Sequence, residues 1–388
     1  MPHPNVKALR LDGYMGVKFP SKILLLKNLR HLVLYGCKKC KNLRPLDQFP
    51  SLKALDLKWL YALEYISEIS SGNNFSNSSF LPSLEELKLN YCPNLKGWWK
   101  KDPIEEVNND DDNYVGITTG MPSASENHLP PLFPLLSKLS IRGCPQLTSM
   151  PLFPYLEKLE LYNCSFKPLE QTAKIATATA AASTSSSSGS SSKLVNSSFT
   201  PLSKLMSLEI GGMEEPLPEG CLRNLISLNR LWIYECRDPL LHGMQHLTEL
   251  KQLGICSSEV FDLSNNGNVM EWQVLRSLSS LWLFQLPKLV SLPMGLRKVT
   301  SMRKLTIDSC PSLMEIPNWI CKLTSLEILE ILQCPKLTSL PIEIGSITTL
   351  LTLKIFHCPI LLRRCNRESG SDWHKISHIP YLYLEEGN

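Results

Sequence analysis

The stretch that decides the fold is "SLEILEILQCPKLTSLP", residues Ser325–Pro341, because its spacing of apolar residues returns along the chain. The same pattern occurs as "SMRKLTIDSCPSLMEIP" from Ser301 and as "TLLTLKIFHCPILL" from Thr349. The copies are 24 residues apart, measured between their first apolar residues, Met302, Leu326 and Leu350. Repeats of about 20 to 29 residues with the form L-x-x-L-x-L-x-x-C/N each supply one β-strand to a stacked solenoid. The chain is therefore predicted to be a repeat protein.

The predicted fold class is α/β, in the form of a leucine-rich-repeat solenoid with the shape of a curved horseshoe. A parallel β-sheet is expected on the concave face, and short helical or irregular segments are expected on the convex face. In "LEELKL", which begins at Leu84, Leu87 and Leu89 alternate with Lys88, and this period of two predicts a strand buried on one side only. Thirteen such strand segments are expected, beginning at Val6, Leu29, Leu52, Leu84, Leu136, Leu156, Leu205, Leu228, Leu250, Leu278, Met302, Leu326 and Leu350.

The whole chain, residues 1–388, is expected to form a single array of about thirteen turns, because repeat arrays grow along one axis. Two intervals between strand segments are too long for one repeat, and their extra residues are polar. Flexible insertions are predicted at about 99–129, which is acidic, and at about 167–200, which is rich in Ser, Ala and Thr. The acidic insertion has two interpretations, a solvated loop or a contact with a basic partner. Residues 363–388 are expected to form a C-terminal cap or tail.

Net charge and hydropathy narrow the classes of partner. A net charge of +4 on 388 residues, without a basic stripe, gives no reason to expect binding to nucleic acid. The first residues, "MPHPNVKALRLDG", contain no apolar leader, and no apolar run approaches the roughly 20 residues that span a bilayer. We therefore expect a cytoplasmic chain without a membrane span.

Cysteines recur with the repeat. Of the 13 cysteines, eight occupy the same position in successive repeats, which predicts a structural ladder of buried, reduced thiols with the S–H group near backbone carbonyls. The ladder consists of Cys37, Cys92, Cys144, Cys164, Cys236, Cys310, Cys334 and Cys358. Cys37 and Cys40 also form a C-x-x-C pair, but no second pair accompanies it, so a metal or redox site is disfavoured.

The sequence lacks the motifs of nucleotide, metal and nucleophilic chemistry. No G-x-x-x-x-G-K-[ST] loop occurs, and "GSSSK" from Gly189 contains only one glycine. Two histidine pairs have the i, i+4 spacing of zinc ligands but lack the Glu of H-E-x-x-H, namely His242/His246 and His374/His378. No nucleophile-elbow motif supports a hydrolytic triad. We therefore expect no enzyme activity, no cofactor and no metal.

Side chains on the concave face of successive strands form columns about 4.8 Å apart. One column runs through Trp232, Gly254 and Trp282. The column two positions later runs through Tyr234, Ser257 and Phe284. Four large aromatics are thus expected together, as in a protein-binding hot spot, with cations beside them. The flanking cations are Arg230, Lys251, Arg303 and Lys304. The competing interpretation is that the rings pack on one another or on the insertions.

The repeat "L-x-x-L-x-I-x-x-C-P-x-L", as in Leu326 to Leu337, resembles the C-terminal leucine-rich repeats of plant intracellular disease-resistance proteins of the coiled-coil, nucleotide-binding type. The tail "LLRRCNRESGSDWHKISHIPYLYLE", with Asp372-Trp373, is similar to the way such proteins end. The resemblance covers nearly the whole chain. It implies an innate immune receptor whose repeats recognise a pathogen effector or a guarded host protein and restrain a nucleotide switch.

The sequence departs from this family at its front. It has no coiled-coil segment, phosphate-binding loop or "MHD" motif, and it opens inside the array with "VKALRL", so a preceding segment is expected and nucleotide binding is not carried over. The predicted function is a protein-recognition module in plant innate immunity. Its expected partners are a protein ligand and, in a full-length receptor, the nucleotide-binding domain. The alternatives are a substrate adaptor for ubiquitin ligation and an extracellular receptor or inhibitor domain.

Overall fold

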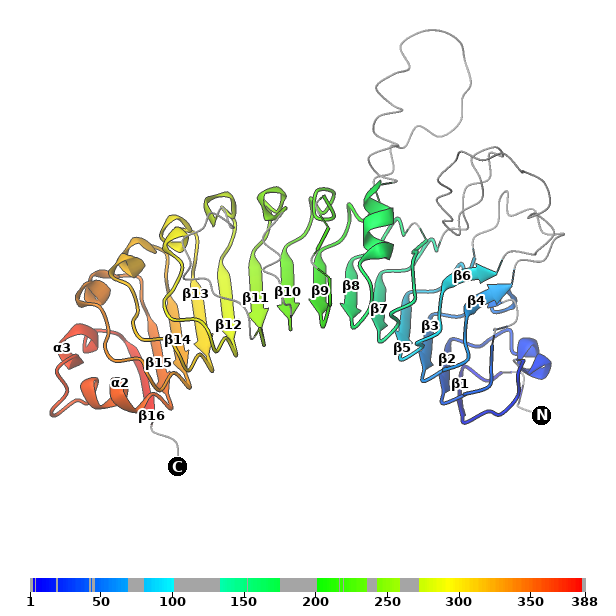
Figure 1. The fold of residues 1–388 in the computed structure, drawn as a ribbon, viewed down its shortest axis with the longest axis horizontal. Coiled ribbons are helices and arrows are strands. Elements are labelled where there is room, and N and C mark those ends of the chain that lie inside the picture. The colour runs from blue at the N-terminus through cyan, green and yellow to red at the C-terminus, as the bar shows by residue number, and fades with distance from the viewer. Residues whose placement is uncertain are drawn as a thin grey trace, which may run out of the picture. The chain divides into compact units, whose positions relative to one another are not determined.

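The computed structural model describes most of the chain (Figure 1). The described residues are 3, 5–18, 20–41, 43, 46–68, 80–100, 133–151, 153–174, 201–215, 217, 218, 220–235, 243–258 and 272–385. The chain divides into two compact units, Met1–Leu205 and Met206–Asn388.

The first unit contains a parallel sheet whose strands follow one another in chain order. Among its described residues the order is β1-β2-β3-β5-β7-β8. These strands are β1 (Ala8–Asp12), β2 (His31–Tyr35), β3 (Ala54–Lys58), β5 (Glu86–Asn90), β7 (Lys138–Arg142) and β8 (Lys158–Tyr162). A second sheet pairs β4 (Tyr65–Glu68) in parallel with β6 (Gly97–Lys100). The connections carry the 3-10 helices η1 (Ser21–Leu25) and η2 (Leu46–Gln48) and a helix at residues 167–174.

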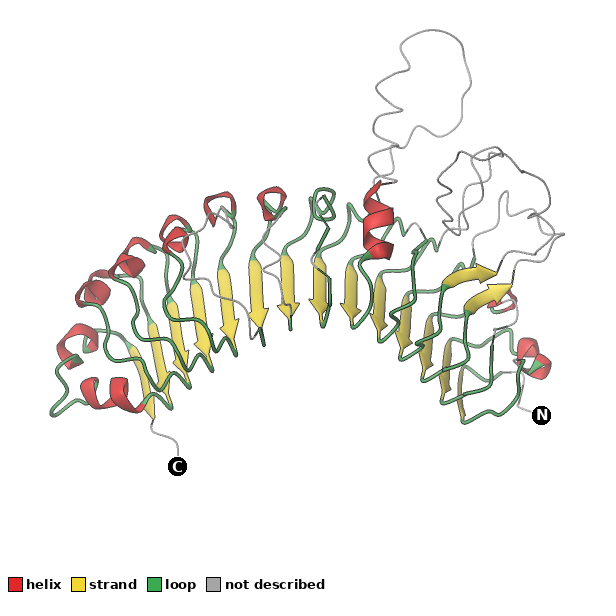
Figure 2. Cartoon of the chain, in the orientation of Figure 1, coloured by secondary structure: helices red, strands yellow, loops and turns green. Residues whose placement is uncertain are grey.

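The second unit repeats the same arrangement, and its strands pair in the order β9 to β16. The strands are β9 (Ser207–Gly211), β10 (Arg230–Tyr234), β11 (Gln252–Cys256), β12 (Ser280–Phe284), β13 (Lys304–Asp308), β14 (Ile328–Leu332), β15 (Thr352–Phe356) and β16 (Tyr381–Glu385). The connections carry the 3-10 helices η4 (Met244–His246), η5 (Trp272–Val274), η6 (Met294–Lys298), η7 (Asn318–Lys322) and η8 (Ile342–Ser346). Within this unit the strands follow the inner side of the arc and the 3-10 helices follow the outer side (Figure 2).

The repeat that decided the fold shows how the leucine pattern produces a turn. Leu329 and Ile331 of β14 are fully buried, and Glu330 between them points to the other face of the sheet. Leu326 and Leu337, before and after the strand, are also fully buried. Each buried Leu or Ile side chain contributes about 1.5 to 3 kcal/mol through removal from water. The predicted fold class, parallel strands joined by short helical segments in a leucine-rich-repeat array, is confirmed.

Proline residues mark the starts of the regular 3-10 helices in the second unit. Pro293, Pro317 and Pro341 directly precede η6, η7 and η8, with φ angles of −64°, −65° and −62°. Proline fixes φ near this value and has no N–H group that the helix start would leave unpaired. These residues therefore turn the chain from the core into each return segment.

The residue that follows each of several strands adopts a left-handed conformation. Trp59 has a φ of 61° and Tyr91 a φ of 55°, whereas neighbouring repeats place Gly36 and Gly143 at this position. The N–H of Trp59 donates to the carbonyl of Asn90, the last residue of the next strand, at 2.9 Å. The bond adds one rung to the sheet beyond the strand. A non-glycine residue in this conformation costs on the order of 1 to 3 kcal/mol.

The stretch expected to be a C-terminal cap folds against the last repeat. Only the end of α2 (Pro359–Arg364) falls within residues 363–388, whereas α3 (Trp373–Ile376) and β16 lie wholly inside this stretch, and β16 pairs in parallel with β15. Among the described residues, β16 is therefore a strand that the leucine pattern did not predict, as are β4 and β6 of the small second sheet. The sheet of the second unit therefore continues into the cap.

A buried carboxylate connects the cap to the preceding repeat. Asp372 is 1% exposed and accepts bonds from Arg364 Nη2 at 3.0 Å, from Lys375 Nζ at 2.9 Å and from the Leu340 N–H at 3.0 Å. Burial alone would raise the pKa of Asp372, but these bonds outweigh burial and lower the pKa. The carboxylate is therefore ionised and fully engaged at neutral pH.

The expected insertions at about 99–129 and about 167–200 lie mostly outside the described residues, which omit residues 101–132 and 175–200. The first residues of each do lie in the described structure. Residues 99 and 100 belong to β6, and residues 167–174 are helical. Thr172 Oγ1 donates to the Pro168 carbonyl at 2.8 Å and is 3% exposed, so this helix is packed against its unit.

Candidate functional site

The strand register places Trp232 of β10 and Trp282 of β12 in one column, with Gly254 of β11 between them. Strands β10 and β12 are about 9.6 Å apart because β11 lies between them, so the two rings meet only in the space above β11. Gly254 leaves that space open, because a Cβ atom at residue 254 would collide with the ring of Trp232. The two indole rings lie with their centroids 5.2 Å apart and their planes at 33°.

Tyr234 joins this pair, since its ring stacks on that of Trp232 at 6.1 Å with an interplanar angle of 15°. Phe284 lies in the same column as Tyr234, two strands away, without a ring contact to the other three in the described structure. All four aromatic side chains are half-buried. We name Trp232, Tyr234, Trp282 and Phe284 the β10–β12 cluster. Three of its four rings therefore pack on one another and still present part of their surface.

The column through Tyr234 and Phe284 corrects one expectation. Its middle residue is Cys256, whereas the sequence analysis placed Ser257 there. β11 pairs with both neighbours without a bulge, so the alternation continues through Cys256. Ser257 follows the strand with a φ of 53°, and its hydroxyl donates to Gln285 Oε1 at 2.7 Å.

The four predicted cations lie at the starts of β10, β11 and β13 and have different partners. Arg230 Nε donates to Gln252 Oε1 at 2.9 Å, and Arg303 pairs with Glu327 at 3.1 Å. Lys251 is exposed and has no acidic partner among the described residues. Because exposed ion pairs are weak, the charges of Arg230, Lys251 and Arg303 are all available to an incoming ligand.

Lys304 belongs to a charged network that the sequence analysis did not identify. Its ammonium lies 2.9 Å from Glu330, which Lys354 also approaches at 2.9 Å and to which Thr306 Oγ1 donates at 2.8 Å. Burial would raise the pKa of Glu330, but the bonds from Lys304, Lys354 and Thr306 outweigh burial and lower the pKa. Thr306, Glu330 and Lys354 stand at the same outward strand position in three successive repeats, and this polar and charged column could have predicted the network from the sequence.

The cysteine ladder lines the turns after the strands. Six of its members in the described structure are buried, Cys164 is half-buried, and Cys236 lies outside the described residues. Cys334 Sγ lies 3.2 Å from the Leu332 carbonyl, and the Cys334 N–H donates to Cys358 Sγ at 3.3 Å. Burial raises the pKa of Cys164 to about 12. The Cys164 thiol is therefore protonated at neutral pH and packs like a small apolar residue.

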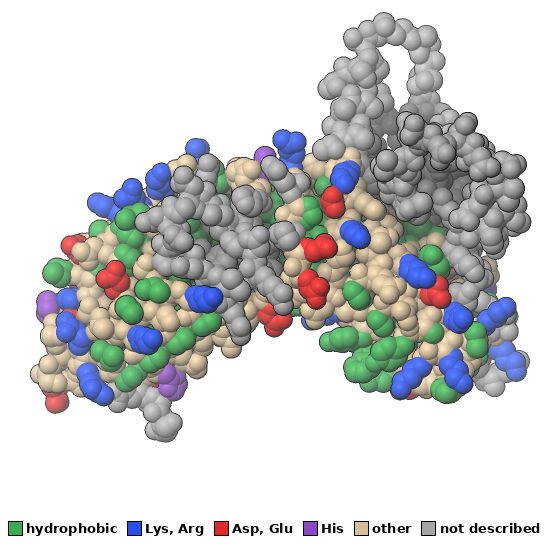
Figure 3. Space-filling model, in the orientation of Figure 1, with side chains coloured by type: hydrophobic (Ala, Val, Ile, Leu, Met, Phe, Trp, Pro, Cys, Tyr) green, Lys and Arg blue, Asp and Glu red, His purple; other side chains and the backbone are tan. Residues whose placement is uncertain are grey.

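The first unit carries a group of exposed aromatics that the sequence analysis did not identify. Tyr35, Trp59, Tyr61 and Tyr91 are 39%, 42%, 37% and 50% exposed. Trp59 lies at the centre, with ring centroids 6.4 Å from Tyr35, 6.2 Å from Tyr61 and 5.4 Å from Tyr91. We name these four residues the strand-end patch, and Figure 3 shows hydrophobic side chains gathered at the strand ends of this unit.

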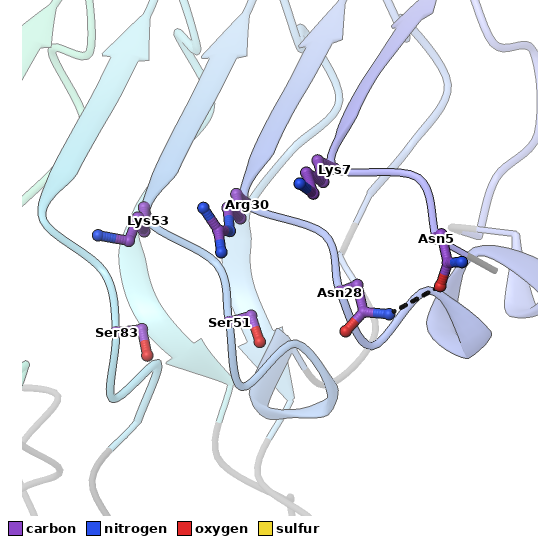
Figure 4. Close-up of a pocket in the computed structure, with 7 residues that line it drawn as sticks. All are labelled: Asn5, Lys7, Asn28, Arg30, Ser51, Lys53 and Ser83. Carbon is purple, nitrogen blue, oxygen red and sulfur yellow. Dashed lines mark hydrogen bonds between the residues drawn. The ribbon is translucent and has the colours of Figure 1, made fainter.

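A hollow of about 510 Å³ lies at the other end of the strands in the first unit (Figure 4). Lys7, Arg30 and Lys53 form one row, and a second row consists of Asn5, Asn28, Ser51 and Ser83. Lys53 pairs with Glu85 at 2.6 Å, while Lys7 and Arg30 have no acidic partner in the described structure. The hollow offers hydrogen-bond donors and positive charge but no acid–base pair.

Of the two histidine pairs, only His374 and His378 lie wholly within the described residues. His374 lies in α3 and His378 follows it, and no group of three or more His, Cys, Asp or Glu side chains comes together there or elsewhere among the residues described. His242 lies outside the described residues. The thiol of Cys37 contacts the Tyr35 carbonyl at 3.7 Å.

The fold is that of a leucine-rich-repeat protein. Residues 1–60 match the family model described as R13L1/DRL21 LRRs. A segment of 108 residues, 27% of this chain, is 33% identical to the putative disease resistance protein RGA4 of Solanum bulbocastanum and covers 11% of it. A segment of 152 residues, 38% of this chain, is 27% identical to the disease resistance protein RGA2 of the same plant and covers 13% of it.

These matches confirm the resemblance to the repeat regions of plant disease-resistance proteins of the coiled-coil, nucleotide-binding type. The matched segments are little more than a tenth of the length of either relative. Among solved structures, an internalin (inlF) from Listeria monocytogenes is similar with a TM-score of 0.39 and 18% identity, over 90% of this chain and 80% of that chain. Repeat regions of the resistance-protein type are typically non-catalytic. Within the described residues, no helix has the length and apolar character to span a bilayer.

Proposed function

We propose that this chain is a protein-recognition module in plant innate immunity and that the β10–β12 cluster is its partner-binding surface. The observation that carries the proposal is the packing of Trp232 against Trp282 over Gly254. Aromatic side chains held in place before binding lose little conformational entropy when a partner covers them. The exposed charges of Lys251, Arg230 and Arg303 form the polar rim that surrounds such an apolar centre in protein interfaces.

The proposed ligand is a pathogen effector or a guarded host protein in the cytoplasm. The similarity to RGA4 and RGA2 supports the immune context, and the aromatic centre with its cationic rim supports a protein ligand. In a full-length receptor, a ligand that binds the active state more tightly than the inactive state shifts the equilibrium of a nucleotide switch by that difference in affinity. The β10–β12 cluster is where this difference would arise.

The test is a double substitution, Trp232→Ala with Trp282→Ala, in the full chain. The matched control is Tyr383→Ala, because Tyr383 of β16 lies in the same register column and is 46% exposed. Proximity labelling in leaf cells is expected to recover a set of proteins with the unmodified chain and the control, and to lose that set with the double variant. Equal recovery by the double variant would contradict the proposal. Thermal unfolding of each variant separates loss of binding from loss of fold.

A further inference from the structure

The strand-end patch of the first unit is not used by the proposed function, which rests on residues of the second unit. Its four rings contact one another and remain 37% to 50% exposed. Contiguous exposed aromatics are uncommon on the surface of a protein that has no partner there. The patch therefore needs a reason beyond the packing of its own unit.

Backbone conformation supplies a second, independent observation. Trp59 and Tyr91 occupy the left-handed position after their strands, with φ angles of 61° and 55°. Gly36 and Gly143 occupy it in the repeats on either side, where a glycine adopts the conformation without strain. Bulky side chains are disfavoured at positive φ. Other repeats carry smaller or polar residues at this position, among them Asn163 and Glu235, so Trp59 and Tyr91 stand out by the size of their rings.

The next repeat leaves room for one of these rings. A Cβ atom on Gly143 would lie 2.8 Å from Cδ1 of Tyr91, closer than carbon atoms approach in folded proteins. The left-handed glycine therefore accommodates the ring of Tyr91, which remains 50% exposed. The space left by the missing side chain of Gly143 thus holds the ring of Tyr91 at the surface and does not bury it.

Charge around the patch is positive once the internal ion pairs are counted. Asp12 pairs with Arg10 at 2.8 Å, and Asp56 pairs with Lys58 at 2.8 Å, so both nearby carboxylates are neutralised. Arg10 also lies over the ring of Tyr35. Two further cations follow the strand that ends at Tyr35, and both are exposed and without an acidic partner in the described structure: Lys38 and Lys39.

Lys38 lies directly beside the patch by repeat position. It stands two residues after the left-handed Gly36, as Tyr61 stands two residues after the left-handed Trp59. Strands β2 and β3 pair in register, so these equivalent positions are neighbours on adjacent turns. The patch therefore combines apolar ring faces with unpaired ammonium groups at one side.

We propose that the strand-end patch is a docking site for a short acidic segment of a partner protein, in which carboxylates flank an aromatic or proline side chain. The ring faces around Trp59 accept the apolar side chain, since aromatic surfaces bind aromatic and proline side chains well. The ammonium groups of Lys38 and Lys39 attract the carboxylates and favour this segment over neutral or basic ones. The site is separate from the β10–β12 cluster, and either proposal stands without the other.

The decisive variant is Trp59→Gly with Tyr91→Gly, because it removes both rings and places at each position the residue that neighbouring repeats use. Glu235→Gly is the matched control, since Glu235 of the second unit is exposed and has a φ of 49° at the same repeat position. A second variant, Lys38→Glu with Lys39→Glu, leaves the rings and the backbone conformation unchanged. The probe is a displayed library of random peptides of about 12 residues, a length that spans several turns of the sheet.

The unmodified chain is expected to enrich peptides that combine Asp or Glu with Trp, Tyr, Phe or Pro. A synthetic copy of an enriched peptide should bind the double-glycine variant about tenfold more weakly, and the lysine variant should bind it more weakly and with less dependence on salt. Binding by Glu235→Gly and by Trp232→Ala with Trp282→Ala should be unchanged. Thermal unfolding of the double-glycine variant should shift by only a few degrees.

Three results would overturn the proposal. One is enrichment of peptides without acidic residues. Another is enrichment by the double-glycine variant equal to that by the unmodified chain. The third is equal affinity of an enriched peptide for the unmodified chain and the lysine variant, which decides the matter even where the double-glycine variant melts at a much lower temperature, because the lysine variant keeps the rings and the backbone conformation.

Discussion

Replacing Asp372 with Asn removes one charge from the C-terminal cap and changes the side-chain shape very little. Asp372 is 1% exposed, and Lys375, whose side chain is 10% exposed, pairs with it at 2.9 Å. Removing one partner of a buried ion pair costs about 3 to 5 kcal/mol, because the other charge stays buried without compensation. The Leu340 N–H, which lies 3.0 Å from Asp372 Oδ2, keeps an acceptor in the Asn variant. We therefore expect a loss of about 3 kcal/mol, at the low end of this range.

The loss should be local, because each turn of a solenoid contacts mainly its neighbours. Native-state hydrogen exchange measures it directly, as the opening free energy of the amide of Tyr381, which donates to the Leu351 carbonyl at 3.0 Å. Arg364→Gln is the control. Because the Arg364 side chain is 43% exposed, this substitution should change the opening free energy of the Tyr381 amide much less. A change of less than about 1 kcal/mol in the Asn variant would refute the reasoning.

The same carboxylate predicts a dependence on pH. The pKa of Asp372 is lower in the folded protein than in the unfolded chain. The stability that ionised Asp372 gives the cap is therefore fully present above the unfolded pKa of about 3.9, and it is lost as the pH falls through the folded pKa. Exchange protection of β16 should therefore decrease in acid, and the Asn variant should lose this dependence. Equal acid sensitivity of the two proteins would exclude Asp372 as its source.

Three further predictions follow from the packing. Leu329→Asp places a charge at a fully buried position, so it should lower stability by more than about 4 kcal/mol and unfold the adjacent turns. Thermal unfolding followed by circular dichroism measures this loss, and an unchanged melting curve would contradict the strand register. Gly254→Val should displace the ring of Trp232, with a cost of about 1 to 3 kcal/mol and an altered tryptophan fluorescence spectrum; an unaltered spectrum would exclude the ring contact over Gly254. Burial would raise the pKa of Glu160, but bonds from Lys158, Arg142 and Ser140 lower the pKa to about 2. The unmodified chain is therefore expected to lose stability between about pH 5 and about pH 2, and Glu160→Gln should flatten this fall in an acid titration; an unchanged profile would argue against these bonds.

The strand positions could be predicted from the sequence because the leucines that determine them are the core itself. Each predicted segment begins at an apolar residue, and the observed strand starts two residues later, as β14 at Ile328 follows Leu326. The aromatic column through Trp232 and Trp282 was predicted for the same reason, since period-two counting assigns each residue to a face. The contact between the two rings depends on side-chain rotamers, which the pattern does not encode.

The strand-end patch could not be predicted in this way. The left-handed position holds Gly36, Trp59, Tyr91 and Gly143 in different repeats, so it has no apolar period and no fixed residue type. Its conformation follows from a backbone hydrogen bond to the next strand, which any residue forms at some cost in strain. Strand β16 was not predicted for a different reason, because its alternation of Tyr and Leu is not followed by the Cys-Pro-x-Leu segment that marks the most regular repeats.

Hydrogen exchange of the full chain, alone and with a protein recovered by proximity labelling, tests the central claim most directly. The account predicts that binding slows exchange in β10, β11 and β12, around the packed rings of Trp232 and Trp282. Protection confined to other strands, with no change in these three, would contradict the assignment of the β10–β12 cluster as the recognition surface.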